Sequence, residues 1–233
     1  MSISVGDTLA NRFVLEHALP STPDILRYRG LDTQTQSAVE IIIPSATALI
    51  RPQQREFFLQ THKENQGHSG YLSCLFCAEE KATPYAVYPA IAGIVQEDLR
   101  LDLEKGQQVL QYLHGILQQH PLPAEEGLQP SNLIVDNEGS LLLRPNGIVP
   151  KRSKITFDIH THPERVEDQQ FSLAMIIYCA TFGIPELRKR VDFLNWIKTP
   201  PSLETLNPDV SPELSGWLTA MIKGEAINVP SLD

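Results

Sequence analysis

The stretch Leu128–Val149, LQPSNLIVDNEGSLLLRPNGIV, decides how the whole chain is interpreted. Two short apolar runs flank a turn sequence in it, which predicts strands at Leu133–Val135 and Ser140–Arg144 joined by a turn at Asn137–Gly139. The second strand ends at Pro145, in the sequence RPNG. Functional side chains often gather where a strand ends, but a proline offers neither a backbone donor nor a side-chain ligand. We therefore ask which chemical group this proline replaces.

Composition and charge exclude several classes of protein. The chain has 233 residues, of which 42% are apolar and 20% charged, enough for one large domain or two lobes with a buried core. Its formal net charge of -9 repels a nucleic-acid backbone, so we expect no nucleic-acid partner. No apolar run reaches the roughly 18 residues of a membrane span, and no secretory signal begins the sequence. We expect no membrane partner and a cytoplasmic location.

The cysteines fit the same expectation. Cys74, Cys77 and Cys179 are an odd number and cannot form a disulfide framework, which suits a reducing compartment. Cys74 and Cys77 form one CxxC pair that is half of a possible zinc site, but no second pair of ligands follows it. We expect no metal there.

The first part of the chain predicts a sheet with one helix. Residues 12–43 alternate in polarity and contain two turn signals, which predicts three antiparallel strands. Arg51–Asn65 predicts a helix, and Tyr71–Ala78 and Tyr85–Tyr88 predict two more strands. Residues 1–92 are therefore expected to form a lobe with a five-stranded antiparallel sheet and one helix.

The remaining residues, 93–233, predict a mainly helical lobe. Leu103–Gln119 carries apolar residues at helical spacing, and Phe171–Thr181 is almost continuously apolar, as in a buried helix. Further helices are expected at Pro185–Trp196 and, after the start signal Ser-Pro-Glu, at Glu213–Lys223. The predicted fold class is α+β.

Four segments resemble bacterial Ser/Thr protein kinases. Leu19–Asp32 resembles the glycine-rich strand-turn-strand of that family, and Leu128–Val149 resembles its catalytic loop and the hairpin that leads to the DFG motif. HPERV at His162–Val166 resembles the APE motif, and Pro200–Ser231 resembles the final helices. The resemblance implies a bilobal protein kinase-like fold over nearly the whole chain.

The same resemblance implies that the nucleotide site has degenerated. The glycines of the phosphate-covering loop would fall on Pro20, Thr22 and Ile25. The phosphate-binding lysine would fall on Ile42, and its glutamate partner on Thr61. No ammonium group is left to hold a phosphate. We therefore expect no cofactor and no tight binding of ATP with magnesium.

The catalytic loop and the metal site have changed in the same way. Where the family has HRDLKPSN, this chain has EEGLQPSN, so the base aspartate becomes Gly127 and the lysine becomes Gln129. Asn132 keeps the identity of a family metal ligand, although a structural role that bonds local amides is the simpler expectation. Pro145 replaces the magnesium-binding aspartate of DFG. Val229 stands where an arginine would pair with Glu164.

A second possible chemistry lies in FDIHTHPE, Phe157–Glu164. On an extended segment Asp158, His160, His162 and Glu164 would project to one side as possible metal ligands. Four ligands on one strand do not easily surround an ion, so no metal site is expected.

Two basic clusters are candidate contacts for a protein partner. Lys151, Arg152 and Lys154, together with His160 and His162, would lie in the activation-segment equivalent, where they could bind an acidic or phosphorylated partner. Ser153 and Thr156 could accept phosphate from a true kinase. The second cluster is Arg188–Arg190. Each cluster could equally be an ordinary solvated face.

Two functions of different kind remain open. The first is a non-catalytic pseudokinase that binds a protein, such as an active kinase or another signalling protein, as a scaffold or regulator. The second is an enzyme or nucleotide sensor with rebuilt chemistry, using Glu125, Glu126 and Asn132 or the two histidines His160 and His162. An apolar ligand could also fill the former nucleotide site, although packing of the same residues in the core is the simpler expectation. The residues that would line such a cavity are Ile25, Ile42, Val87 and Leu133.

Overall fold

The structure is a computed structural model. It describes residues 3–50, 52–64, 67–90, 93–94, 100–123, 126–129, 132–135, 140–149, 168–183, 190–225 and 227–230. The chain divides into two compact units, which are described separately. Unit 1 comprises residues 1–94 and 132–150, and unit 2 comprises residues 95–131 and 151–233. The boundary predicted between residues 92 and 93 stays a prediction, because a division by compactness does not test which segments fold as a domain.

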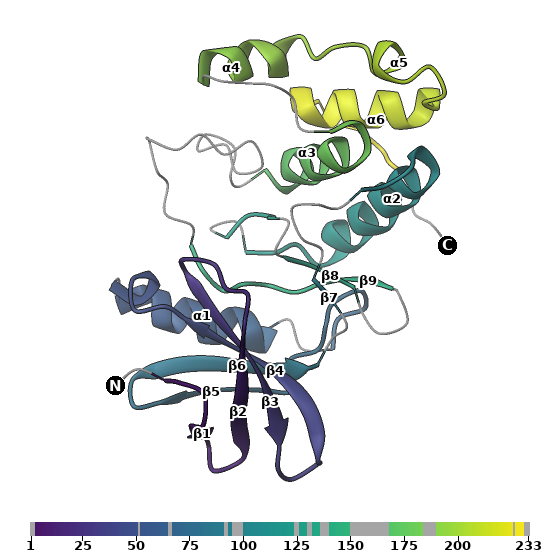
Figure 1. The fold of residues 1–233 in the computed structure, drawn as a ribbon. Helices are drawn as coiled ribbons and strands as arrows, with labels where there is room; N and C mark the ends of the chain where they lie inside the picture. Colours follow the sequence, from purple (N-terminus) through teal and green to yellow (C-terminus); the bar gives the residue numbers. More distant parts are fainter. Residues whose placement is uncertain are drawn as a thin grey trace. The chain divides into compact units, whose positions relative to one another are not determined.

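Unit 1 is built on an antiparallel six-stranded sheet with the order β1-β2-β3-β4-β6-β5. Its strands are Thr8–Leu9 (β1), Phe13–Leu19 (β2), Ile25–Asp32 (β3), Ser37–Pro44 (β4), Phe76–Glu80 (β5) and Thr83–Pro89 (β6). Helix α1, Pro52–Glu64, follows a short 3-10 turn at Ala48–Ile50 and contacts β5 and β6 (Figure 1). The predicted helix is confirmed over these residues.

The sheet has an apolar cluster on each face, because successive side chains of a strand point to opposite sides. Val39, Ile41 and Ile43 of β4 pack with Phe13 and Tyr28 in one cluster. Ile42 faces the other way, into the second cluster, whose other buried members are Ile25, Phe58, Leu72, Cys74, Ala86, Tyr88, Ile134 and Ile148. Strand β4 has apolar residues on both faces, which explains its three consecutive isoleucines, Ile41–Ile43.

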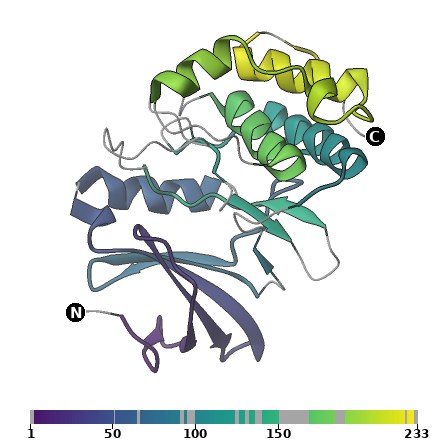
Figure 2. The ribbon, with the colours of Figure 1, turned by 45° about the horizontal axis from the view of Figure 1, so that its top comes forward.

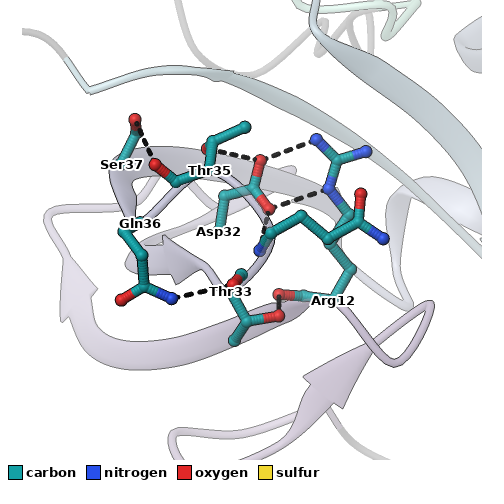
Figure 3. A network of polar contacts seen from close by, with 7 residues as sticks. Arg12, Asp32, Thr33, Thr35, Gln36 and Ser37 are labelled. Carbon is teal, nitrogen blue, oxygen red and sulfur yellow. Dashed lines mark hydrogen bonds and ion pairs between the residues drawn. The ribbon is translucent and has the colours of Figure 1, made fainter.

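The turn between β3 and β4 is organised around the buried carboxylate of Asp32 (Figure 3). Arg12 donates to both carboxylate oxygens, at 2.8 and 2.7 Å. The Gln34 amide and the Thr35 hydroxyl donate to the same carboxylate, at 3.0 and 2.9 Å. These donors hold the pKa of Asp32 well below its usual range, the Arg12 hydrogen bonds contributing most. Asp32 therefore has a structural role in this turn.

A second, three-stranded sheet has the order β7-β8-β9. It contains the predicted hairpin, with Leu133–Val135 as β8 and Leu141–Leu143 as β9, and adds Gly93–Ile94 as β7. The predicted turn between β8 and β9 lies outside the described residues.

Unit 2 is helical in the described residues (Figure 2). Its helices are Leu103–Gln119 (α2), Gln169–Phe182 (α3), Arg190–Lys198 (α4), Leu203–Leu206 (α5) and Pro212–Lys223 (α6). Helix α3 packs against both α2 and α6, and ten consecutive residues of it are buried, from Phe171 to Ala180. Asp102, Asp168 and Ser211 cap α2, α3 and α6 by accepting a backbone N–H three residues later. The helix predicted at Glu213–Lys223 is confirmed and begins one residue earlier, at Pro212, after the N-cap Ser211.

Three expectations about the elements need correction. The main sheet has six strands and not five, because Thr8–Leu9 pairs with β2. The strand predicted at Tyr71–Ala78 begins only at Phe76, since Tyr71 forms an isolated bridge with Leu143 instead. The helix predicted at Pro185–Trp196 is described from Arg190 onward and continues to Lys198.

Candidate functional site

The three positions expected to replace loop glycines lie at the β2–β3 connection. Pro20 and Thr22 are exposed, and Ile25 is a buried first residue of β3. The Thr22 amide donates to the Ile25 carbonyl at 3.0 Å, and the Ile25 amide donates to the Thr22 hydroxyl at 3.1 Å. The Thr22 and Ile25 amides are therefore engaged in closing this turn.

The residues expected to replace the lysine and its glutamate partner carry no charge. Ile42 is fully buried in the apolar cluster beside Phe58. Thr61 is buried on α1, with 2% of its surface exposed. The charged side chain on the Ile42 face of β4 is Glu40, two residues earlier along the strand.

Glu40 lies between two arginines from distant parts of unit 1. The Arg27 Nε and Nη2 atoms are both 2.8 Å from Glu40 Oε1. Arg144 Nη1 donates to the same oxygen at 2.5 Å. The side chains of Glu40 and Arg144 are 4% and 3% exposed, so this is a buried ion cluster. We call Arg27, Glu40 and Arg144 the ion triad.

The ion triad contains two positive charges and one negative charge. Burial lowers the pKa of Arg27; Glu40 acts against this effect, while the positive charge of Arg144 adds to it. The Arg144 guanidinium carbon lies 5.6 Å from the centre of the Tyr88 ring, within range of a cation–π contact. The guanidinium groups of both arginines are thus directed at groups of the protein itself.

Asn132, which the resemblance places at a metal-ligand position, is fully buried. Its side-chain amide donates to the Arg144 carbonyl at 2.9 Å, and the Arg144 amide donates to the Asn132 carbonyl at 2.7 Å. This side-chain bond goes to a carbonyl across the hairpin, whereas we expected bonds to local amides. This bond uses the NH2 group of the Asn132 side chain. A metal ion would instead bind the oxygen of the same side-chain amide.

Gly127, expected at the position of the base aspartate, adopts a left-handed backbone with φ of 71°. Glycine is the default residue there, since a side chain in this region is disfavoured. The neighbouring Glu126 is fully buried, and Gln129 is partly buried. Glu125 lies outside the described residues.

The segment around Pro145 is bonded to α1. Gln54 of α1 donates through Nε2 to the Gly147 carbonyl at 3.0 Å, and its Oε1 accepts from the Val149 amide at 3.1 Å. Gly147 has φ of 65°, and a Cβ at this position would lie 2.9 Å from His62 Nε2 and 3.0 Å from Phe58 Cδ2. This position therefore admits only glycine without movement of its neighbours.

His62 joins the same region to the sheet. Its Nδ1 atom lies 2.5 Å from the Tyr88 hydroxyl, and the imidazole is fully buried. Burial, and then the nearby charge of Arg144, lowers the pKa of His62 to about 3. The imidazole is therefore neutral at physiological pH.

The expected partner residues lie outside the described residues. These are Lys151, Arg152, Lys154, His160 and His162, and with them Ser153, Thr156, Asp158, Glu164 and most of Arg188–Arg190. Within the described ranges, no group of three or more His, Cys, Asp or Glu side chains is arranged to hold a metal ion. Val229 is a buried apolar residue. No described helix is both long and apolar enough to cross a membrane.

The four residues expected around an apolar cavity do not form one group. Ile25 and Ile42 belong to one apolar cluster of the sheet, and Val87 belongs to the cluster on the opposite face. Leu133 is fully buried. The expected set was wrong for Val87, because β6 sends Ala86 and Tyr88 to the face of Ile42.

The ion triad and Gln54 were missed from the sequence. A signal for Glu40 was present, since a single carboxylate inside the run AVEIII would be buried and would need a partner. The partner Arg144 is 104 positions away, and Gln54 is 93 positions from Gly147. Sequence spacing gives no signal for contacts of this range.

Comparisons with known proteins place the fold. No family model matches the chain, and no curated protein matches its sequence. The Mycobacterium tuberculosis PknI kinase domain superimposes with a TM-score of 0.70 at 16% identity, over 95% of this chain and 91% of that one. A second PknI structure gives 0.68 at 18% identity with the same coverage. The structure described as the apo form of PpkA-294 gives 0.73 at 16% identity, over 98% of this chain and 94% of that one. The chain therefore has a kinase-like fold, shared with bacterial protein kinase domains.

Proposed function

We propose that this chain is a pseudokinase: a protein-binding scaffold or regulator that neither binds ATP with magnesium tightly nor transfers its phosphate. The observation that carries the proposal is the ion triad. Phosphate binding needs a positive charge directed at the ligand, and here both arginines of the triad are directed at Glu40. Pro145, the residue after Arg144, has no carboxylate for a metal ion.

A second alignment of β4 strengthens the proposal. The kinase lysine ends a V-A-I-K sequence, and Ala38-Val39-Glu40 fits the last three positions of that sequence without a gap. In this register the lysine is replaced by a carboxylate whose charge is compensated by Arg27 and Arg144, so no ammonium group is offered to a phosphate. In the register that uses Ile42, the position is apolar. Both alignments remove the ammonium group.

The losses act together on affinity and on rate. Two opposite unit charges about 6 Å apart attract by roughly 1 to 3 kcal/mol at effective dielectrics between 80 and 20, so each missing charged ligand removes an attraction of this size. Each 1.4 kcal/mol lowers affinity about tenfold. Loss of a general base at the Gly127 position lowers the rate by roughly a further hundredfold or more.

Calorimetric titration of ATP, with and without magnesium, tests the proposal. We expect no saturable binding tighter than about 1 mM and no incorporation of labelled phosphate in an autophosphorylation assay. The matched variant is Asn132→Ala, which removes the retained family metal ligand. Micromolar, magnesium-dependent binding, or labelling that Asn132→Ala abolishes, would establish the alternative of an enzyme or sensor with rebuilt chemistry.

The protein partner is proposed on the basic residues of the former activation segment. Charge reversal at Lys151, Arg152 and Lys154 should weaken recovery of the main cellular partner and leave thermal stability nearly unchanged. Equal recovery by this variant and the wild type would place the interface elsewhere.

A further inference from the structure

Leu143–Val149 follows the hairpin and contains the position where the resemblance implies a metal ligand. All residues from Leu143 to Ile148 are buried, and Val149 is partly buried. Only Leu143 belongs to a strand. A buried stretch without regular secondary structure must find partners for its backbone polar groups elsewhere. Four sets of contacts either supply these backbone partners or hold the side chains of Leu143–Val149 in place.

The first set bonds the segment's start to two other backbones. The Leu143 amide donates to the Gly70 carbonyl at 2.8 Å, and the Leu72 amide donates to the Leu143 carbonyl at 2.8 Å. The reciprocal Asn132–Arg144 backbone and side-chain bonds described above extend this pairing by one residue. The segment therefore starts as a short bridge between the residue 70–72 stretch and the hairpin.

The second set is the pair of hydrogen bonds from Gln54. One primary amide accepts from Val149 and donates to Gly147, as a neighbouring strand would. Gln54 is itself only 4% exposed, so water does not compete strongly for these bonds. The end of the segment is thereby fixed to α1.

The third and fourth sets involve side chains. Arg144 is bonded to Glu40 of β4 within the ion triad. Ile148 packs into the apolar cluster with Phe58 and Ile42, and Gly147 lies against His62 and Phe58. The sheet, α1 and the hairpin thus all contact the same seven residues.

We propose that Leu143–Val149 is a permanent clamp, locked onto the sheet and α1 of unit 1 without nucleotide or metal. The contacts use groups of the chain alone, and the position that the resemblance gives to a metal ligand is filled by Pro145. The clamp rests on the proposed function, because it supplies from within the protein the fixation that a bound ligand would otherwise give. It implies that the segment does not switch between two positions when nucleotide is added.

Hydrogen exchange by mass spectrometry on the full chain tests the clamp. Peptides covering residues 143–149 should exchange at least about 100-fold more slowly than an unstructured peptide, and ATP with magnesium should not slow them further. Gln54→Met keeps the side-chain volume and removes both hydrogen bonds, so it should speed exchange of these peptides about tenfold. The strands β2 to β4 should be unaffected. The control, Gln60→Met on the exposed side of the same helix, should leave exchange in residues 143–149 unchanged.

Three results would overturn the clamp. They are wild-type exchange within about threefold of an unstructured peptide, a tenfold or larger gain in protection with ATP and magnesium, and equal exchange in Gln54→Met and wild type. The wild-type measurements need no variant, so a Gln54→Met protein that fails to fold leaves the test intact. Calorimetric ATP binding with no change in this segment would overturn the proposed function and leave the clamp standing.

Discussion

Replacing Glu40 with glutamine separates the charge of the ion triad from its shape. Glutamine has nearly the same volume and retains one acceptor oxygen, but it leaves Arg27 and Arg144 buried without the carboxylate that they share. Two unit charges about 4 Å apart attract by roughly 4 kcal/mol at an effective dielectric of 20, before the cost of removing them from water. Loss of one partner from a buried pair typically destabilises by about 3 to 5 kcal/mol. We expect Glu40→Gln to lower the free energy of unfolding by that amount.

The triad also predicts an asymmetry between its members. Arg144→Met leaves Arg27 and Glu40 as a neutral pair and removes the repulsion between the two arginines. It should therefore destabilise by only about 1.5 to 3 kcal/mol, the range of a lost hydrogen bond to a charged group. The matched control is Glu79→Gln, because the Arg55–Glu79 pair is 3.6 Å apart with side chains 42% and 35% exposed. We expect the control to change stability by less than about 0.5 kcal/mol.

Urea denaturation followed by far-ultraviolet circular dichroism measures these differences. Tryptophan fluorescence is less suitable, because both tryptophans, Trp196 and Trp217, belong to helices of unit 2. A loss of stability in Glu40→Gln no larger than that in the Glu79→Gln control would contradict this prediction. A larger loss in Arg144→Met than in Glu40→Gln would contradict it as well.

Three further predictions concern other sites. The pKa of His62 is about 3 in the folded protein and about 6.5 in the unfolded chain. The free energy of unfolding should therefore fall by roughly 1.4 kcal/mol per pH unit as the pH drops from 6.5 towards 3. Urea titrations at several pH values should show this slope in the wild type and lose it in His62→Gln. A Cβ on Gly106 of α2 would lie 2.7 Å from the Thr181 hydroxyl, so Gly106→Ala should lower the free energy of unfolding by about 1 to 3 kcal/mol. Gly216→Ala on the open side of α6 should instead raise it by up to about 1 kcal/mol. Equal effects of the two substitutions would refute the close packing of α2 and α3. Because the pKa of Asp32 is depressed, its ionised carboxylate stabilises the fold above the ordinary carboxyl pKa of about 3.9, and this stabilisation is lost in stronger acid. Asp32→Asn should therefore reduce the steepness of acid unfolding followed by circular dichroism.

Local pattern predicted most elements of the fold. Leu103–Gln119 was predicted with the bounds that the structure gives, because a regular apolar stripe and an N-capping aspartate act within a few residues. Strand β1 was missed because two residues are too few to show alternation. Tyr71 was assigned to the wrong element because its backbone partner is Leu143, far along the chain.

The candidate site was harder to predict for the same reason. The family resemblance predicted Ile42 and Pro145 as the residues that would stand at a phosphate-binding and a metal-binding position. The ion pair between Glu40 and Arg144 could not be predicted, since these residues meet only when β4 lies against the end of the hairpin. A buried charge signals that a partner exists, but burial itself is a property of the folded chain.

Unit 1 has a consequence for the order in which the protein acquires structure during synthesis. Its sheet and α1 are complete in sequence by residue 94, yet Ile134 and Ile148 belong to the same buried cluster as Ile42 and Phe58. A nascent chain that has emerged only as far as residue 94 would therefore expose this apolar face while about 55 further residues, up to Val149, are made; this takes several seconds at synthesis rates of roughly 5 to 20 residues per second. An N-terminal fragment ending near residue 94 should accordingly bind chaperones and aggregate, and the arrival of Asn132–Val149 should end that vulnerable period.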